Sequence, residues 1–464
     1  MRIAHFLWLL IASLVGCASL PANEPKNRPV SALTSQGQER QAASENVVAL
    51  SFSGGGLRAA AFAFGVLEGL REQQSSGDRT LLDEVRFVSS VSGGSLTAAY
   101  LGLRGSEGMQ NFRSEVLFRN GEAGLRLSLL NLNNLYRLWM GGINDRSDFS
   151  SWLEKDVFKG ATFAEMSGSL KPEIWIAATN LQYRVAFPFH QRAFDALCSD
   201  LASYPVSEAV AASMAVPLLF APVVLQRFPE ACEVDIPPGL QAPQSNEDDD
   251  QYRLRKALAR FHRDLAQPDT GRYLKLVDGG LTDNLGLVSV LQTRLLLNTP
   301  YGPIPMKDAL TMKRLLFVVV DAGQAGSGNW GKELAGPSAI AVAEGAIDTA
   351  IESTVRMSYA GFKALVRDWE RDVISFRCGL SQEHQAALKD SHAGWRCDDV
   401  TFAITQISFA HLPEDDERAL NAIPTRLSLP ADQIDRLITS AKRVVGTDPR
   451  IRSFARSTRP GQPP

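Results

Sequence analysis

The chain has 464 residues, of which 45% are hydrophobic, and its formal net charge is −3 at pH 7. This length and apolar content suffice for one large folded body with a substantial hydrophobic core. The nearly balanced charge excludes a chain built to bind polyanions, so we expect no nucleic-acid partner.

The first residues predict export to the cell envelope. Met1 and Arg2 precede an apolar stretch, residues 3–15, which has signal-peptide length and is too short to span a membrane. The sequence Leu-Val-Gly-Cys at 14–17 resembles a bacterial lipobox. That resemblance implies a lipoprotein signal peptide at 1–16 and an acylated, palmitate-carrying Cys17. An ordinary secreted protein cleaved nearby is the alternative.

The segment after the cysteine predicts a tether. Residue 18 is Ala and not the Asp that typically retains lipoproteins in the inner membrane, so the outer membrane is the expected location. Residues 17–45 are rich in Pro, Asn, Gln, Ser and Glu, which is typical of disorder. A flexible coil of this length spans on the order of 30 Å.

A glycine-rich turn follows the first predicted strand. The apolar run at 47–52 reads as a buried strand, and residues 59–70 have helical spacing. Between them, Gly54, Gly55 and Gly56 leave backbone N–H groups unobstructed at a helix N-terminus, which is the geometry for holding a negative charge. A phosphate site is the weaker interpretation, since no Lys follows the glycines and residue 59 is Ala where a dinucleotide fingerprint ends in Gly. A tight turn without a ligand is the other alternative.

A second strand-to-helix turn carries a candidate nucleophile. Residues 85–91 predict a strand, and Ser92, Gly93 and Gly94 lead into a helix beginning near residue 95. A serine at such a sharp turn matches the nucleophile elbow, whose pattern is Gly-x-Ser-x-Gly. Ser90 stands where the first glycine belongs, so a glycine-only conformation there would be strained.

Two insertions interrupt the predicted body. The first, residues 111–158, contains an apolar stretch at 127–140 that could cover the active-site mouth, touch lipid or belong to the core. The second, residues 235–270, combines an acidic run at 246–250 with a charged helix at 252–265. A solvated surface loop is the simplest interpretation of that charge, with a lid or partner site as the alternative.

A candidate acid–base residue closes a later strand. Residues 273–277 predict a strand that ends in Asp278, Gly279 and Gly280. The ends of strands in open α/β sheets are where functional groups gather, although an Asp before Gly is also an ordinary turn former. Further strands at 173–178 and 314–320 alternate with helices near 285–298 and 338–368. The alternation predicts a mainly parallel sheet covered by helices on both faces.

Four motifs, taken together and in this order, resemble the patatin-like phospholipases. They are Ser-Gly-Gly-Gly-Leu-Arg at 53–58, Ser-Val-Ser-Gly-Gly at 90–94, Ala-Ser-Met-Ala-Val-Pro at 212–217, and Asp-Gly-Gly at 278–280 with Leu-Thr-Asp-Asn after it. The resemblance implies a three-layer α/β/α fold with helical insertions and a catalytic domain over 46–330. It leaves 331–464 as a helical extension packed on that domain.

The resemblance also implies a mechanism. Patatin-like enzymes use a Ser–Asp dyad, which maps onto Ser92 as nucleophile and Asp278 as general base. Backbone groups of Gly54, Gly55 and Gly56 would form the oxyanion hole, and Arg58 matches the family's arginine. An ester lipid, with phospholipids first, is the expected substrate, and no cofactor is expected.

Two other functions remain open from the sequence. A Ser–Asp–His triad in α/β-hydrolase order would need His384, His392 or His411, but none of these follows a clear strand end. His190 precedes Asp278 and breaks that order. A non-catalytic envelope lipoprotein that binds lipid or a partner is the second alternative.

Four cysteines follow Cys17. Their even number in an exported chain favours two disulfides, and proximity favours Cys198–Cys232 and Cys378–Cys397 among the three possible pairings. Free buried thiols are the alternative. Their scatter argues against a metal site, and nothing in the sequence indicates an oligomeric state.

Overall fold

The computed structural model describes residues 23–31, 44–126, 131–168, 171–241, 251–324, 334 and 336–458. The predicted signal peptide at 1–16, Cys17 and the acidic run at 246–250 lie outside these residues. No described helix is long and apolar enough to cross a lipid bilayer.

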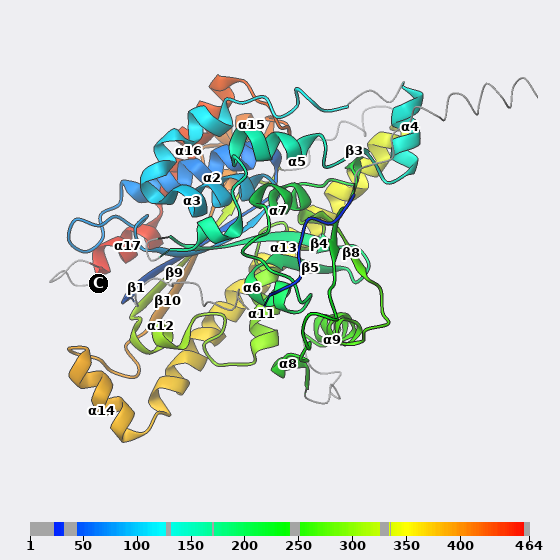
Figure 1. Cartoon of the computed structure of the whole chain (residues 1–464). Coiled ribbons are helices and arrows are strands. Elements are labelled where there is room, and N and C mark those ends of the chain that lie inside the picture. Colours follow the sequence, from blue (N-terminus) through cyan, green and yellow to red (C-terminus); the bar gives the residue numbers. More distant parts are fainter. Residues whose placement is uncertain are drawn as a thin grey trace, which may run out of the picture.

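A central eight-stranded sheet organises the molecule (Figure 1). Its strand order is β10-β9-β1-β2-β4-β8-β7, and β5 pairs with β4. The five strands from β10 to β4 are parallel, while β5, β8 and β7 run antiparallel to their neighbours on the β4 side. The strands are β1 (Asn46–Phe52), β2 (Val85–Val91), β4 (Glu173–Asn180), β5 (Val185–Phe189), β7 (Val223–Gln226), β8 (Tyr273–Asp278), β9 (Arg314–Asp321) and β10 (Thr401–Ser408).

Helices cover both faces of the sheet, so the predicted three-layer α/β/α arrangement is confirmed (Figure 1). Alternation along β1 explains the two layers, because successive side chains of a strand point to opposite faces. Val48, Leu50 and Phe52 pack in the cluster that contains α2, α3 and α16, whereas Val47 and Ala49 pack in the cluster that contains α13. The layer helices are α2 (Gly56–Arg71), α3 (Gly93–Gly108), α11 (Val288–Leu297), α13 (Ala339–Cys378) and α16 (Ala431–Thr447).

The first insertion contributes one strand to a small second sheet. Strand β3 (Gly142–Asn144) pairs in parallel with β6 (Leu218–Phe220), which follows the Ala-Ser-Met-Ala-Val-Pro segment. Helix α4 (Leu132–Trp139) precedes β3. The remaining helices are α5 (Phe149–Trp152), α6 (Gln191–Asp195), α7 (Val206–Ser213), α8 (Pro238–Gln241), α9 (Tyr252–Ala266), α10 (Gly280–Asp283), α12 (Met306–Thr311), α14 (Gln382–Ser391), α15 (Glu414–Asn421) and α17 (Pro449–Ser457).

The region after residue 330 is not only a helical extension. Strand β10 joins the central sheet beside β9, in register from Thr401↔Arg314 to Ser408↔Asp321. As the last strand on its side of the sheet, β10 is only partly buried, whereas β1 and β9 are almost fully buried. Its sequence therefore lacks a continuous apolar run, and sequence analysis did not detect the strand. Residues beyond 330 therefore complete the central sheet itself.

The predicted tether is also partly structured. Residues 23–31, expected to be disordered, run along the body (dark blue in Figure 1). The Asn27 side chain donates to Ser199 Oγ at 2.9 Å and to the Gln226 carbonyl at 2.7 Å, and it accepts from the Gln226 N–H at 2.9 Å. Backbone bonds from Val30 to Cys198 and from Asp200 to Arg28 extend the contact. A polar composition concealed the docking because backbone and amide hydrogen bonds hold this segment.

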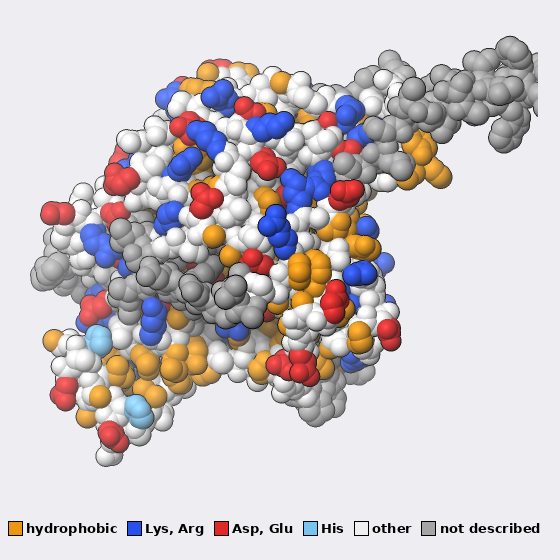
Figure 2. All heavy atoms as spheres, viewed as in Figure 1, with side chains coloured by type: hydrophobic (Ala, Val, Ile, Leu, Met, Phe, Trp, Pro, Cys, Tyr) orange, Lys and Arg blue, Asp and Glu red, His pale blue; other side chains and the backbone are white. Residues whose placement is uncertain are grey.

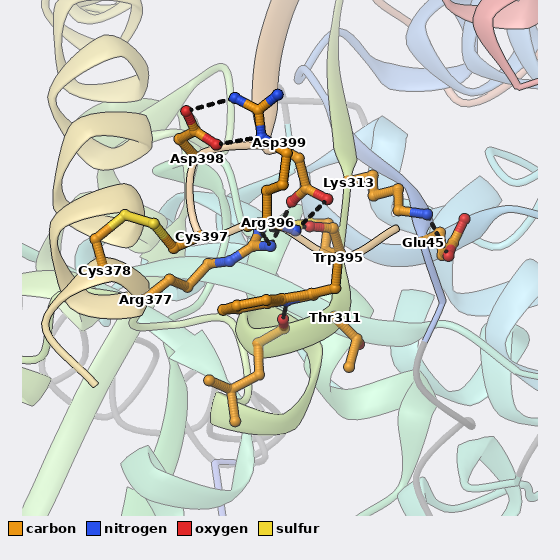
Figure 3. A network of polar contacts seen from close by, with 12 residues as sticks. Glu45, Thr311, Lys313, Arg377, Cys378, Trp395, Arg396, Cys397, Asp398 and Asp399 are labelled. Carbon is orange, nitrogen blue, oxygen red and sulfur yellow. Dashed lines mark hydrogen bonds and ion pairs between the residues drawn. A yellow bond between two sulfur atoms is a disulfide. The ribbon is translucent and has the colours of Figure 1, made fainter. Parts of the chain in front are cut away.

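Both disulfides have the pairing expected from proximity, Cys198–Cys232 and Cys378–Cys397. The second lies beside a buried arginine where α13 ends (Figure 3). The Arg377 side chain forms an ion pair with Asp399 and donates to the carbonyls of Met312 at 3.0 Å and Arg396 at 2.7 Å. Its guanidinium also lies 5.1 Å from the ring centroid of Trp395. This network joins the end of α13 to the starts of β9 and β10.

We predict that Arg377→Ala lowers the free energy of unfolding by about 2–4 kcal/mol, because it leaves Asp399 and two carbonyl groups without their donor. Urea unfolding under oxidising conditions measures the change. Arg371→Ala is the matched control, since its ion pair with Asp368 is exposed, and it should cost less than about 1 kcal/mol. Equal midpoints for the two variants would contradict the structural role of Arg377.

Candidate active site

The site lies where two strands, β2 and β8, end next to each other along β4. Strand β5 pairs with residues 176–180 on one edge of β4, so β8, which pairs with residues 178–180, must share the other edge with β2. On that edge Val91 is opposite Ala177 and Asp278 is opposite Ala178. Since β2 and β8 run in opposite directions, their carboxyl ends meet, and Ser92 comes directly after Val91.

Asp278 ends strand β8, as the sequence predicts, but β8 is one of the antiparallel strands of this mainly parallel sheet. Asp278 nevertheless lies at the carboxyl ends of the parallel strands, because β8 begins beyond those ends and runs back toward them.

Ser92 occupies a strained backbone conformation. Its φ of 48° and ψ of −123° lie in a region that L-residues sparsely populate, as a nucleophile elbow requires. The Ser92 hydroxyl donates to Asp278 Oδ2 at 3.0 Å, and both side chains are buried. Helix α3 begins at the next residue, so Ser92 lies at the positive end of a helix dipole.

Asp278 is held for proton transfer. Its Oδ1 atom accepts the N–H of Gly280 at 2.8 Å, which leaves Oδ2 facing Ser92. Burial raises the pKa of Asp278 from 3.8 to about 6, while the hydrogen bonds from Gly280 and Ser92 act in the opposite direction. At pH 7 the carboxylate therefore predominates, yet its basicity is higher than that of an exposed aspartate.

The elbow depends on two glycines but not on a third. A Cβ atom on Gly93 would lie 1.9 Å from the carbonyl oxygen of Gly56, and one on Gly94 would lie 2.7 Å from Phe52 Cβ. Ser90, by contrast, remains within strand β2, and its hydroxyl donates to the Trp175 carbonyl at 3.0 Å. Replacement of the pattern's first glycine is therefore accommodated, because the strain begins only at Ser92.

The glycine-rich loop approaches the elbow with only part of its N–H groups available. The N–H of Gly54 donates to the Asn284 carbonyl at 3.0 Å, and that of Leu57 donates to Arg426 at 2.7 Å. Within the described residues, the N–H groups of Gly55 and Gly56 have no such acceptor. Their φ values of 133° and 59° favour glycine at both positions. Of the three glycines, these two are the candidates for binding an oxyanion.

Arg58 supports the glycine-rich loop, and its hydrogen bonds go to backbone carbonyls and not to Ser92 or Asp278. Its Nε donates to the Ala322 carbonyl and its Nη1 to the Ile423 carbonyl, both at 2.9 Å. Burial lowers the pKa of Arg58 to about 10, against the charges of Asp321, Asp348 and Glu352, so it remains a cation at neutral pH. Arg58 thus ties the glycine-rich loop to the end of β9 and to the region beyond residue 330.

Two residues that the sequence argument did not assign a role complete the geometry. Ser213 Oγ accepts the N–H of Ser92 at 2.7 Å and donates to the Ala177 carbonyl at 2.6 Å, which holds the elbow to β4. The side chain of Asn284 comes within 2.4 Å of the position that a Cβ on Gly54 would take. Both residues fall inside the motifs at 212–217 and 278–284, and this was the available signal.

The glycines after Asp278 have distinct functions. A Cβ on Gly279 would lie 2.2 Å from the Ala177 carbonyl oxygen, so only glycine allows this approach of β8 to β4. Gly280 supplies the N–H that orients the carboxylate. Asp283, three residues further on, is fully buried and accepts from the N–H groups of 287–289, so it supports the start of α11.

No described histidine contacts the dyad. His384 hydrogen-bonds with Ser381, His392 with Ser391 and His411 with Ser408. The ring of His190 packs against Trp175 with centroids 4.6 Å apart and the planes tilted by 49°, and burial lowers the pKa of His190 to about 3. The predicted triad partners are therefore in other places, and the only side chain that accepts from Ser92 Oγ within the described residues is Asp278.

Two cavities lie away from the dyad. One of about 160 Å³ is lined by Phe87, Trp175 and Trp369, and another of about 370 Å³ lies between β5, α9 and α11. Neither is lined by Ser92 or Asp278. Within the described part of the chain, no group of three His, Cys, Asp or Glu side chains could hold a metal ion.

Comparison with known protein families gives one match. The model of the family described as patatin-like phospholipase matches residues 50–291, which include the glycine-rich loop, Ser92 and Asp278. The chain belongs to the patatin-like phospholipase family. A search of curated protein sequences found no match.

Solved structures with similarity to this patatin-like chain include two proteins. VipD from Legionella pneumophila is 14% identical, with a TM-score of 0.34 over 95% of this chain and 71% of that protein. Human GIVD cytosolic phospholipase A2 is 12% identical, with a TM-score of 0.38 over 89% of this chain and 60% of that protein.

Asp278→Asn should stabilise the fold at neutral pH. Because the folded-state pKa is about 6 and the unfolded value lies near 4, ionised Asp278 destabilises the folded state above pH 6, and below about pH 4 the difference disappears. We expect a higher melting temperature at pH 7.5, equivalent to about 2–3 kcal/mol at most, and no difference at pH 3.5. Calorimetry across this pH range measures it. The exposed Asp78→Asn variant is the control, and an equal effect of both variants would contradict the burial argument.

Proposed function

We propose that the chain is a serine acyl hydrolase that cleaves ester lipids, phospholipids first, through a Ser92–Asp278 dyad. The observation that carries the proposal is the 3.0 Å hydrogen bond from a strained elbow serine to a buried carboxylate. Family membership supports lipid acyl hydrolysis as the reaction class.

In the first half-reaction, Ser92 Oγ attacks the ester carbonyl carbon while its proton passes to Asp278 Oδ2. The tetrahedral intermediate then collapses, the C–O bond to the alcohol breaks, and the leaving alcohol takes the proton from Asp278. The acyl group remains on Ser92 as an ester. A base with a pKa of about 6 suits both steps, since it is ionised at neutral pH and strong enough to share the serine proton.

In the second half-reaction, a water molecule gives its proton to Asp278 and attacks the acyl ester. Collapse returns the proton to Ser92 and releases the fatty acid. Through both halves, negative charge develops on the carbonyl oxygen, and the N–H groups of Gly55 and Gly56 are our candidates to stabilise it. Loss of one such donor typically costs about 100- to 1,000-fold in rate.

We further propose that the enzyme is a lipoprotein of the bacterial outer membrane, acylated at Cys17 after removal of residues 1–16. Support comes from the lipobox-like sequence at 14–17 and from the alanine at position 18. An anchored enzyme would face its substrate continuously, which agrees with an ester lipid as substrate.

The dyad predicts the behaviour of five variants. Ser92→Ala should abolish both fluorophosphonate labelling and phospholipid turnover, and Asp278→Asn should lower turnover at least about 1,000-fold, because each removes a group that acts in both half-reactions. Alanine variants of His384, His392 and His411 should retain turnover. Gel fluorescence and fatty-acid release measure the two activities.

Ser90→Ala is the matched control for the nucleophile, since Ser90 is a buried serine two residues away whose hydroxyl bonds only to a backbone carbonyl. It should still be labelled. Loss of turnover in any histidine variant, with Asp278→Asn still active, would establish a triad. Absence of labelling in the wild-type protein would favour the non-catalytic alternative.

A further inference from the structure

Helix α4 buries polar side chains and exposes apolar ones, which is the reverse of the usual pattern for a surface helix in water. Its polar residues Asn134 and Arg137 are buried, with 7% and 4% of their surfaces exposed. Its apolar residues Leu135 and Trp139 are 45% and 79% exposed, one turn apart on the outer face. A surface helix in water shows the opposite pattern, since apolar burial drives its packing. An outward apolar face implies an apolar environment outside.

The exposed face continues beyond the helix into a patch. Met140 follows α4 and is 40% exposed, and Leu218 of β6 is 44% exposed. Leu218 is the Cα partner of Gly142, two residues after Met140, so it lies beside the end of α4. We call Leu135, Trp139, Met140 and Leu218 the α4 patch. Figure 2 shows hydrophobic side chains exposed at the upper right, where Figure 1 places α4.

Buried charges fix the patch to the body. The side chain of Arg137, on the inner face of α4, donates to the Ile143 carbonyl at 2.8 Å and forms a buried ion pair with Asp145. The patch also lies near the dyad along the chain, because the Ala215 carbonyl, three residues before Leu218, accepts the N–H of Asp278 at 2.8 Å. The short segment 215–218 therefore connects the patch to the end of the strand that carries the catalytic carboxylate.

The docked N-terminal segment brings the proposed anchor close to the residues that follow α4 and β3 in the chain. Arg146, next to Asp145, donates to the backbone carbonyl of Glu24, and Lys26 forms ion pairs with Glu154 at 3.0 Å and Glu208 at 2.8 Å. From Cys17 to Glu24 the chain advances seven residues, which span at most about 25 Å when fully extended. A free tether up to residue 45 would instead have reached about 100 Å.

We propose that the α4 patch docks on the surface of the lipid bilayer that holds the Cys17 anchor, with Trp139 inserted at the interface. This rests on the proposed function, since it presupposes acylation of Cys17. Trp and Leu side chains favour the interfacial region of a bilayer. The Cys17 anchor and the α4 patch would then be two contacts with the same bilayer. Together they would turn this side of the molecule toward lipid.

Brominated phospholipids test the contact directly, because bromine quenches tryptophan fluorescence only at short range. The full-length acylated protein is reconstituted in phosphatidylethanolamine–phosphatidylglycerol vesicles with and without brominated acyl chains. We expect the wild-type protein to lose fluorescence in brominated vesicles and Trp139→Phe to lose markedly less. Equal quenching of the two proteins would overturn the proposal.

Kinetics provide a second readout with a matched control. Trp139→Ser combined with Leu135→Ser should lower turnover of vesicle phospholipid about ten-fold and leave turnover of a water-soluble short-chain ester unchanged. Met306→Ser is the control, since Met306 is 52% exposed on α12, which precedes β9, a strand of the central sheet and not of the β3–β6 sheet beside α4. It should leave both rates unchanged. An equal loss on both substrates in the patch variant would assign the patch to the fold or the dyad and overturn membrane docking.

The same experiment separates this inference from the proposed function. Quenching that depends on Trp139, in a protein with no fluorophosphonate labelling, would support docking and refute catalysis. Dimers that form without vesicles and disappear in Trp139→Ser would show that the patch covers a second copy of the chain, which would overturn the docking proposal.

Discussion

The hydrogen bond between Ser92 and Asp278 depends on one topological constraint, which is that β2 and β8 end against each other on a single edge of β4. A parallel strand and an antiparallel strand cannot both continue along that edge. Their carboxyl ends therefore meet between Ala177 and Ala178, and the residues that follow must turn away sharply. The strain at Ser92 and the glycine at 279 are consequences of this meeting. The site is thus built into the pairing of the sheet.

Holding these groups together carries a cost in stability. A non-glycine residue in the elbow conformation costs on the order of 1–3 kcal/mol, and burial of the Asp278 carboxylate adds to it. The structure compensates with hydrogen bonds around the dyad. The Ser92 N–H donates to Ser213 Oγ, Arg58 donates to the carbonyls of Ala322 and Ile423, and the Gly280 N–H donates to the Asp278 carboxylate. Part of this support comes from beyond residue 330, outside the region matched by the family model. We infer that the catalytic domain needs its carboxyl-terminal region to keep the glycine-rich loop in place.

Much of the site could be predicted from the sequence, because its chemistry depends on local motifs. The turn glycines, Ser92 and Asp278 each follow an apolar run, and a strand-to-helix turn is encoded within a few residues. The features that sequence analysis missed depend on residues that are distant in the sequence. Neither the antiparallel direction of β8 nor the occupied N–H of Gly54 can be read locally, since each depends on residues more than 90 positions away. Strand β10 and the docking of Asn27 were missed for the same reason.

The central claim is that Ser92 forms a covalent ester with the acyl group of its substrate. Rapid acid quenching of the wild-type protein during phospholipid turnover, followed by proteolysis and mass spectrometry, tests it most directly. The account predicts a fatty-acyl mass increase on the peptide that contains Ser92, and on no peptide of Ser92→Ala. Turnover without an acylated peptide, or acylation of another residue during turnover, would contradict it.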